Sequence, residues 1–251
     1  MQYARRAEQS ASLLAVLGVW AVATMVFGTV ASLPSPVEVA FAFVDAAAGA
    51  ALWEEVALSS FRVFVSFLVA ALVGIPLGLL IGRYEVVADL TFPSLELLRP
   101  IPPIAWYPAL TIILLSAENI VRVIIFLAAF FPILLNTIEG VRGVEEEYPR
   151  AARSLGASPT QTLRHVVLPG ALPSIYTGVV NAMGLAWVSL VAAELLSSSG
   201  LGYFIWNAFT AGEYPNVVVG MISVGALGYV SSALVRRLGA YQVPWLRSAD
   251  A

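Results

Sequence analysis

Long apolar stretches make up most of this chain, and short polar segments between them carry most of the charged residues. A helix needs about 20 apolar residues to cross a hydrocarbon core of about 30 Å. Six stretches are long enough, near residues 11–31, 57–82, 94–115, 120–139, 171–196 and 217–237. The pattern therefore predicts an all-α polytopic membrane protein with six transmembrane helices. We divide it into an N-terminal span with an interfacial segment (1–56), a core transmembrane domain (57–237) and a C-terminal tail (238–251).

The third apolar stretch is interrupted by four prolines, Pro100, Pro102, Pro103 and Pro108. Proline is tolerated in a spanning helix where neighbouring helices or water satisfy the freed carbonyl groups. We therefore expect a broken helix that is buried in the bundle and does not face lipid.

Two shorter segments are predicted to lie at the membrane surface. Residues 36–56 fit one amphipathic helix whose polar side carries Glu38, Asp45, Glu54 and Glu55. Residues 197–216 begin with a Ser- and Gly-rich turn and continue with Tyr203, Phe204, Trp206 and Phe209. Aromatic side chains favour the headgroup region, so this segment is predicted to be a short re-entrant or interfacial helix. It could serve as an aromatic anchor or as part of a gate.

The first apolar stretch follows Arg5 and Arg6 and resembles a secretory signal in this respect. The apolar core of a signal peptide is shorter, about 7–15 residues. No convincing cleavage site follows Ala31. We therefore interpret the stretch as a retained first span.

Composition agrees with a membrane protein, because 59% of the residues are hydrophobic and only 12% are charged. Soluble domains carry about 25% charged residues. The chain has no cysteine and one histidine, His165, so disulfides and thiolate metal sites are excluded. The net charge of −3 gives no indication of nucleic-acid binding.

Arginine placement predicts the orientation, since positive residues favour the cytoplasmic side. With a cytoplasmic N-terminus, ten of the 13 arginines fall inside, namely Arg5, Arg6, Arg83, Arg142, Arg150, Arg153, Arg164, Arg236, Arg237 and Arg247. Both termini and the 140–170 loop are then cytoplasmic.

The 140–170 loop contains the signals of two short helices. The first is expected over residues 145–154, with Gly156 ending it in a left-handed conformation. The second is expected to start with Ser158 as N-cap, Pro159 at the first helical position and Gln161 completing a capping box. Pro169 is expected to stop this second helix. The spacing fits an ordinary helical hairpin or a surface where a partner docks.

Several motifs resemble one family. Ala151-Ala152, Gly156 and Leu168-Pro169 resemble the EAA loop of the permease subunits of ATP-binding-cassette importers. Residues 98–106, 130–137, 184–187, 192–194 and 199–203 resemble the nitrate/sulfonate/taurine branch, and the similarity extends over residues 52–237. One departure is Arg150, which stands where the family has Glu. This departure leaves the usual charge pairing with the ATPase in doubt.

The resemblance implies a permease subunit in a prokaryotic cell membrane, working as a homodimer or with a paralogous permease. A binding protein would deliver a small oxyanion or organic solute such as nitrate, taurine or a sulfonate. Two copies of a cytosolic ATPase would use ATP, and this chain would be no enzyme and bind no cofactor. The ATPases would dock on residues Arg150, Ala151, Ala152, Arg153, Leu155, Gly156, Ala157, Ser158, Pro159 and Pro169.

The residues proposed for the translocation path are Arg99, Pro102, Pro103, Trp106, Asn181, Trp187, Ser189 and Glu194. Arg99 could attract an anion or extend to the cytoplasmic interface. Glu194 could belong to an outer gate, or be a helix-end carboxylate satisfied by the turn at 197–199. Asn181 and Trp187 are six residues apart, so both cannot line one narrow path directly.

Other classes of function are less well supported. The chain has no Gly-rich phosphate loop with its lysine, no His-Glu-x-x-His motif and no nucleophile elbow. A secondary transporter or channel would predict inverted repeats and ionisable residues near mid-membrane. A membrane enzyme would need clustered His, Asp or Glu. A structural scaffold would not need a long polar loop with capped helices.

Overall fold

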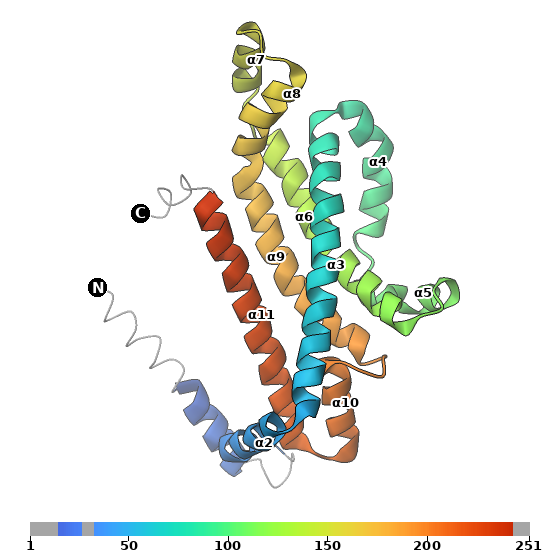
Figure 1. Cartoon of the computed structure of the whole chain (residues 1–251), viewed down its shortest axis with the longest axis vertical. Helices are drawn as coiled ribbons and strands as arrows, with labels where there is room; N and C mark the ends of the chain where they lie inside the picture. The colour runs from blue at the N-terminus through green and yellow to red at the C-terminus, as the bar shows by residue number, and fades with distance from the viewer. Residues whose placement is uncertain (1–14, 27–32, 243–251) are drawn as a thin grey trace, which may run out of the picture.

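The computed structural model describes residues 15–26 and 33–242, and all regular structure in these ranges is helical. Within them, four helices are long and apolar enough to cross a membrane. They are α3 (Ala50–Arg83), α6 (Ala117–Arg142), α9 (Leu168–Glu194) and α11 (Tyr214–Gln242), and they run along the long axis of the molecule (Figure 1). The prediction of an all-α membrane protein is confirmed.

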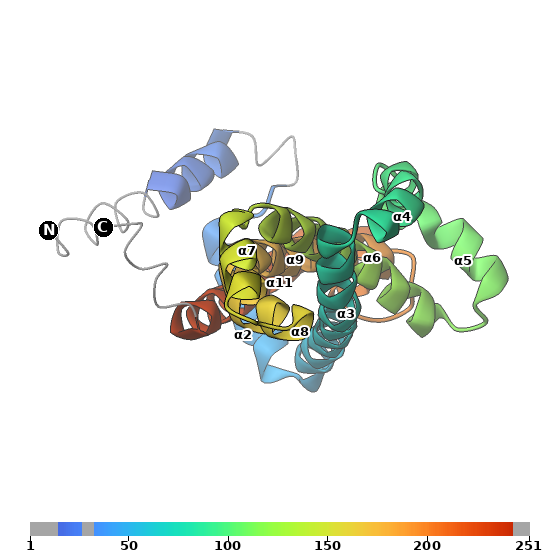
Figure 2. The same cartoon turned by 90° about the horizontal axis from the view of Figure 1, so that it is seen from above.

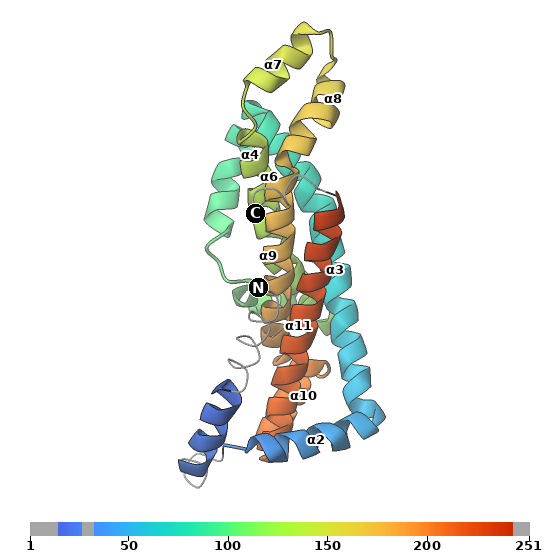
Figure 3. The same ribbon diagram turned by 90° about the vertical axis from the view of Figure 1, so that its left-hand side faces the viewer.

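The two ends of the bundle differ. At one end, here called the loop end, the chain between α6 and α9 projects beyond the other helices and forms α7 (Glu147–Ser154) and α8 (Pro159–Thr162). At the other, here called the α10 end, α10 (Leu201–Ala211) packs beside α11, and α2 (Pro36–Ala48) lies across the bundle (Figure 3).

The predicted third span is broken, as expected, but it is not buried. The chain forms α4 (Glu85–Leu98), a turn, a 3-10 helix (Pro103–Trp106) and α5 (Tyr107–Ile113), which is too short to cross a membrane. Prolines at 100, 102 and 103 explain the break, since proline lacks an N–H and disfavours a helical residue before it. Ile112 and Ile113 are 85% and 73% exposed, and α5 projects sideways from the bundle (Figures 1 and 2). The prediction that this segment is buried is therefore wrong for the single chain.

The N-terminal predictions are resolved only in part. Ala15–Val26 is an apolar helix, whereas the rest of the predicted first span (11–31), Arg5, Arg6 and Arg247 lie outside the described residues. The single surface helix predicted over 36–56 is wrong, because extended Gly49 separates α2 from α3. Ser35 and Glu38 form a capping box at the start of α2, and hydrogen bonding to Ser35, chiefly from its backbone N–H, lowers the pKa of the Glu38 carboxyl.

The projecting loop agrees with its sequence signals except at its end. Gly156 has φ +87°, and Ser158 and Gln161 form the predicted capping box, with Ser158 N–H donating to Gln161 Oε1 at 2.8 Å. Pro169 does not stop the second helix, because α8 continues through a π turn (Leu163–Val167) into α9. The wider π turn accommodates the proline. Pro159–Glu194 is therefore one continuous helix.

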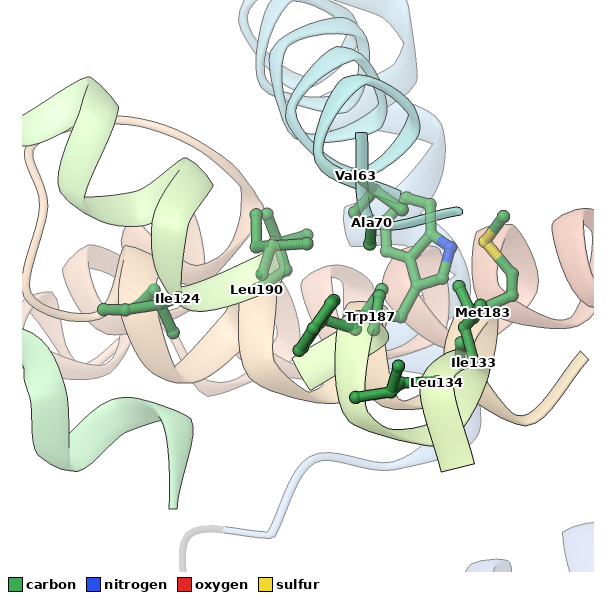
Figure 4. Close-up of a cluster of buried hydrophobic side chains, with 14 of the residues drawn as sticks. Val63, Ala70, Ile124, Ile133, Leu134, Met183, Trp187 and Leu190 are labelled. Atoms are coloured by element: carbon green, nitrogen blue, oxygen red, sulfur yellow. The ribbon is translucent and has the colours of Figure 1, made fainter. Parts of the chain in front are cut away.

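The core forms where α6 packs between α3 and α9. Ile124, Ile133 and Leu134 of α6 and Leu190 of α9 are completely buried (Figure 4). The helices α6 and α9 approach closely at Gly178, where a Cβ would lie 2.8 Å from the Pro132 carbonyl oxygen. Small residues permit such close helix packing in membranes. This close pair of helices also forms the wall of the cavity described next.

Candidate functional site

A polar cavity of about 760 Å³ opens among α6, α9, α11 and the end of α4. We call it the arginine cavity. Its polar lining consists of Arg99, Asn136, Glu139, Asn181, Ser232 and Arg236. Helix α9 also exposes Gly184 and Leu185 to it. Polar side chains in an otherwise apolar bundle are costly unless they face water or partners, so their gathering indicates a water-accessible space.

A smaller cavity of about 190 Å³ adjoins the first. The two share Arg99, Phe131, Pro132 and Leu185, so they form one continuous space. The smaller cavity is also lined by three further residues predicted for the path, namely Pro103, Trp106 and Ser189. The interruption of the helix after α4 brings these residues together, because the turn directs the 3-10 helix against α6 and α9.

The other predicted path residues lie elsewhere. Pro102 is exposed in the turn and lines neither cavity. Trp187 is 3% exposed, and its indole N–H donates to Ser231 Oγ on α11 at 2.8 Å. Asn181 faces the cavity, while Trp187 packs in the core (Figure 4), as their six-residue separation predicts.

Glu194 belongs to a largely buried polar group at the α10 end, here called the ionic cluster (Ser59, Arg62, Glu118 and Glu194). Arg62 Nη1 donates to Glu194 Oε1 at 2.8 Å, and Arg62 Nε donates to Glu118 Oε2 at 2.9 Å. Ser59 Oγ donates to the Glu194 carboxylate at 2.8 Å. The Arg62 side chain is 3% exposed and that of Glu194 is 0% exposed. The Glu118 side chain, on α6, is 30% exposed. The cluster therefore joins α3, α6 and α9, and its Arg62–Glu194 pair is buried away from solvent.

The turn between α9 and α10 wraps around this carboxylate. Gly202 N–H donates to Glu194 Oε2 at 2.9 Å, and Leu201 N–H donates to Ser59 Oγ at 2.8 Å. Gly200 has φ +100°, and a Cβ there would lie 2.1 Å from Glu194 Oε1. One prediction from the sequence makes the turn at 197–199 the partner of the Glu194 carboxylate. In the structure Ser199 bonds Arg62, and Glu194 is satisfied by Ser59, Arg62 and Gly202.

The sequence reasoning missed Ser59, Arg62 and Glu118 as partners of Glu194. A signal was present, because Arg62 and Glu194 are opposite charges in two apolar spans, and such charges usually pair. Ser59 lies three residues before Arg62, which places both on one face of α3.

The projecting loop exposes most of the residues predicted for docking. Leu155 at its tip is 90% exposed, and Arg150, Ala151 and Arg153 are also exposed. Arg150 Nε lies 3.3 Å from Glu146 Oε2 one turn earlier, so its charge is partly offset within α7. Ala152 and Ala157 are half-buried, while Gly156, Ser158 and Pro159 are exposed. Pro169 lies within the continuous helix and away from the tip.

These features define a polytopic helical membrane protein with an open polar cavity between its helices and a projecting helical loop. The chain belongs to the family of binding-protein-dependent transport system inner membrane components, whose sequence profile matches residues 74–248. Its place is therefore the plasma membrane, which it crosses several times. A nitrate import permease protein, NrtB of Synechocystis sp., is 34% identical over 243 residues, which cover 93% of this chain and 88% of NrtB.

Two other comparisons agree with this assignment. An ABC transporter permease protein of Methanocaldococcus jannaschii, MJ0413, is 46% identical over 171 residues, which cover 67% of this chain and 64% of that protein. A structure of the MetNI methionine ABC transporter in an inward-facing conformation matches with a TM-score of 0.58 and 23% identity, over 77% of this chain and 95% of that chain. The structural match supports the fold. Membership of this family favours a transport subunit of an importer over the alternatives of a secondary transporter, a channel or an enzyme.

Proposed function

We propose that the arginine cavity and the smaller cavity beside it are this subunit's share of the translocation path. A binding protein on the side of α10 would deliver a small oxyanion or organic solute, such as nitrate, taurine or a sulfonate. The solute would leave towards the loop end. Family membership supports the importer class, and the polar lining supports the position of the path.

The observation that carries the proposal is the continuous helix Pro159–Glu194. It begins in the projecting loop and then supplies Asn181, Leu185 and Ser189 to the walls of the two cavities. A helix can transmit displacement along its axis because most of its turns are hydrogen-bonded to one another. The π turn at Leu163–Val167 and the prolines at 169 and 173 interrupt this ladder near the loop, but the chain stays helical through them. Movement of the loop by a partner would therefore reach the cavity walls through continuous helix.

The partner at the loop is proposed to be a cytosolic ATPase, with one copy on each of two permease subunits. ATP would bind to the ATPases, and this chain would hold no cofactor. Arginine placement supports a cytoplasmic loop end and cytoplasmic termini. The tip offers Leu155, which is 90% exposed at the end of a charged helix and suits an apolar pocket on a soluble partner. An ATPase that prefers one loop position in its ATP-bound state would bias the permease towards one conformation.

The second permease subunit is proposed to be another copy of this chain. Asn181, Gly184 and Leu185 line the arginine cavity and are still exposed in the single chain, so another wall is needed to enclose the path. A paralogous permease could supply that wall in the same way.

The test is to purify the tagged full chain from its native membranes in mild detergent and identify its partners by mass spectrometry. Leu155→Asp places a charge at the tip, and Asn207→Asp makes a comparable change at an exposed position of α10, at the opposite end. We expect a cytosolic ATPase with the parent and with Asn207→Asp, and its loss with Leu155→Asp. An ATPase retained by Leu155→Asp would contradict docking at this tip. Absence of any ATPase from a folded parent would contradict the proposed partner.

A further inference from the structure

We infer that the arginine cavity is an anion-selecting site, in which Arg99 and Arg236 together attract an anionic solute. The inference rests on the proposed function, because it assumes that solute passes through this cavity. It adds Arg236 to the functional residues and gives the permease subunit a part in specificity, in addition to that of the binding protein.

The charge balance of the cavity carries the first step. Three ionisable side chains line it, namely Arg99, Glu139 and Arg236, which gives one net positive charge. None of the three takes part in an ion pair within the described residues. Arg62 differs in this respect, since its guanidinium is held by Glu118 and Glu194. The two cavity arginines therefore keep their hydrogen-bond donors available.

The origin of the two arginines carries the second step. Arg99 is the C-cap residue of α4, where the helix is interrupted. Arg236 lies near the end of α11, far from Arg99 in the sequence. Both line the same hollow beside α9. A guanidinium presents a planar fork of N–H donors that matches the oxygens of carboxylates and other oxyanions. Two such forks from different helices can approach one solute from two sides.

The neutral polar residues complete the site. Asn181 faces the cavity and makes no hydrogen bond within the described chain, so its amide can donate to a solute oxygen. Asn136 donates one N–H to the Pro132 carbonyl at 2.9 Å, which fixes the orientation of its amide. Glu139 is the opposing charge, and it would weaken anion retention on the side of the loop end.

The charge preference can be measured without knowing the substrate, because the chain has no cysteine. Gly184 lines the cavity, and a Cβ there meets no atom within 4 Å, so Gly184→Cys introduces one reporter thiol in open space. The full-length variant in nanodiscs of neutral lipid would be treated with an anionic or a cationic methanethiosulfonate reagent. The measured quantity is the ratio of the two rates, normalised to the same ratio at Asn207→Cys on α10.

We expect the anionic reagent to be favoured at Gly184→Cys by about threefold or more, since one net positive charge nearby attracts the anionic reagent and repels the cationic one. Adding Arg99→Gln or Arg236→Gln should abolish this preference, and Glu139→Gln should increase it. Arg237→Gln is the matched control, because Arg237 is the exposed neighbour of Arg236 and lines neither cavity. Arg236→Lys should retain the preference, which separates loss of charge from misfolding.

A normalised ratio near one, or a ratio unchanged by both glutamine substitutions, would overturn the anion site. Failure of both reagents to react with Gly184→Cys would also overturn it, because a solute could not then enter the cavity. The partner purification is independent of these rates. An ATPase that binds a chain without charge preference would leave the proposed importer standing and remove only the anion site.

Discussion

Substitution of Arg62 by methionine should destabilise the protein more than any single surface change. Arg62 donates five hydrogen bonds, to Glu118, Glu194 and Ser199. Its loss leaves the Glu194 carboxylate fully buried without a counter-charge. Breaking a buried ion pair from one side costs about 3–5 kcal/mol. For a chain of this size, each kcal/mol lowers Tm by about 2–4 °C, so a decrease of about 6–20 °C follows.

The control for this prediction is Arg122→Met. Like Arg62, Arg122 contacts the Glu118 carboxylate, with Nη2 lying 3.0 Å from Glu118 Oε1, but the Arg122 side chain is 36% exposed. A partly exposed pair one helical turn apart is worth less than about 1 kcal/mol. Thermal unfolding in detergent, followed by tryptophan fluorescence, would compare both variants with the parent under one set of conditions.

The double variant Arg62→Met/Glu194→Met tests the cause. If the cost of Arg62→Met comes from an uncompensated buried charge, removal of that charge should restore part of the lost Tm. Glu118 would remain paired with Arg122 in this variant. A double variant whose Tm is equal to or below that of Arg62→Met would refute the reasoning. The cluster would then stabilise by packing and hydrogen bonding alone.

Two further substitutions test the packing of α9. Gly178→Ala should lower Tm, because its Cβ would lie 2.6 Å from Asn136 Cβ, and such overpacking costs about 1–3 kcal/mol. Gly184→Ala on the same helix meets no atom and should leave Tm unchanged or slightly raised; equal effects of the two would contradict the close α6–α9 contact. Trp187→Phe should lower the free energy of unfolding by at least about 1 kcal/mol, because the hydrogen bond to Ser231 is lost. An unchanged Tm in the same unfolding assay would contradict that bond.

Local sequence signals predicted the parts of this fold that local interactions determine. The cap at Ser158, the left-handed Gly156 and the apolar lengths of α3, α6, α9 and α11 depend on neighbouring residues and were predicted correctly. Local signals gave a wrong prediction where the surrounding helix geometry determines the structure. Pro169 carries a strong stop signal, but the preceding π turn accommodates it, and no residue spacing announces that turn.

The candidate site shows the same division. Arg99, Pro103, Trp106, Asn181 and Ser189 were predicted and do line the two cavities. The sequence predicts Arg236 only as a cytoplasmic charge, because its place in the cavity depends on how α11 packs beside α9. The side chains that bind the Glu194 carboxylate, those of Ser59 and Arg62, lie more than a hundred residues away, so a single sequence indicates that a partner is needed without naming it.

The two ends of α9 are held very differently, and this asymmetry determines how the path would open. At Glu194 the helix is pinned by buried charges, which makes that end a pivot. Ser189 lies about 7.5 Å from the pivot and Asn181 about 20 Å, at 1.5 Å per residue. A given tilt therefore moves Asn181 about 2.6 times as far as Ser189. If the proposed path is correct, it would widen most at the loop end and least at the α10 end.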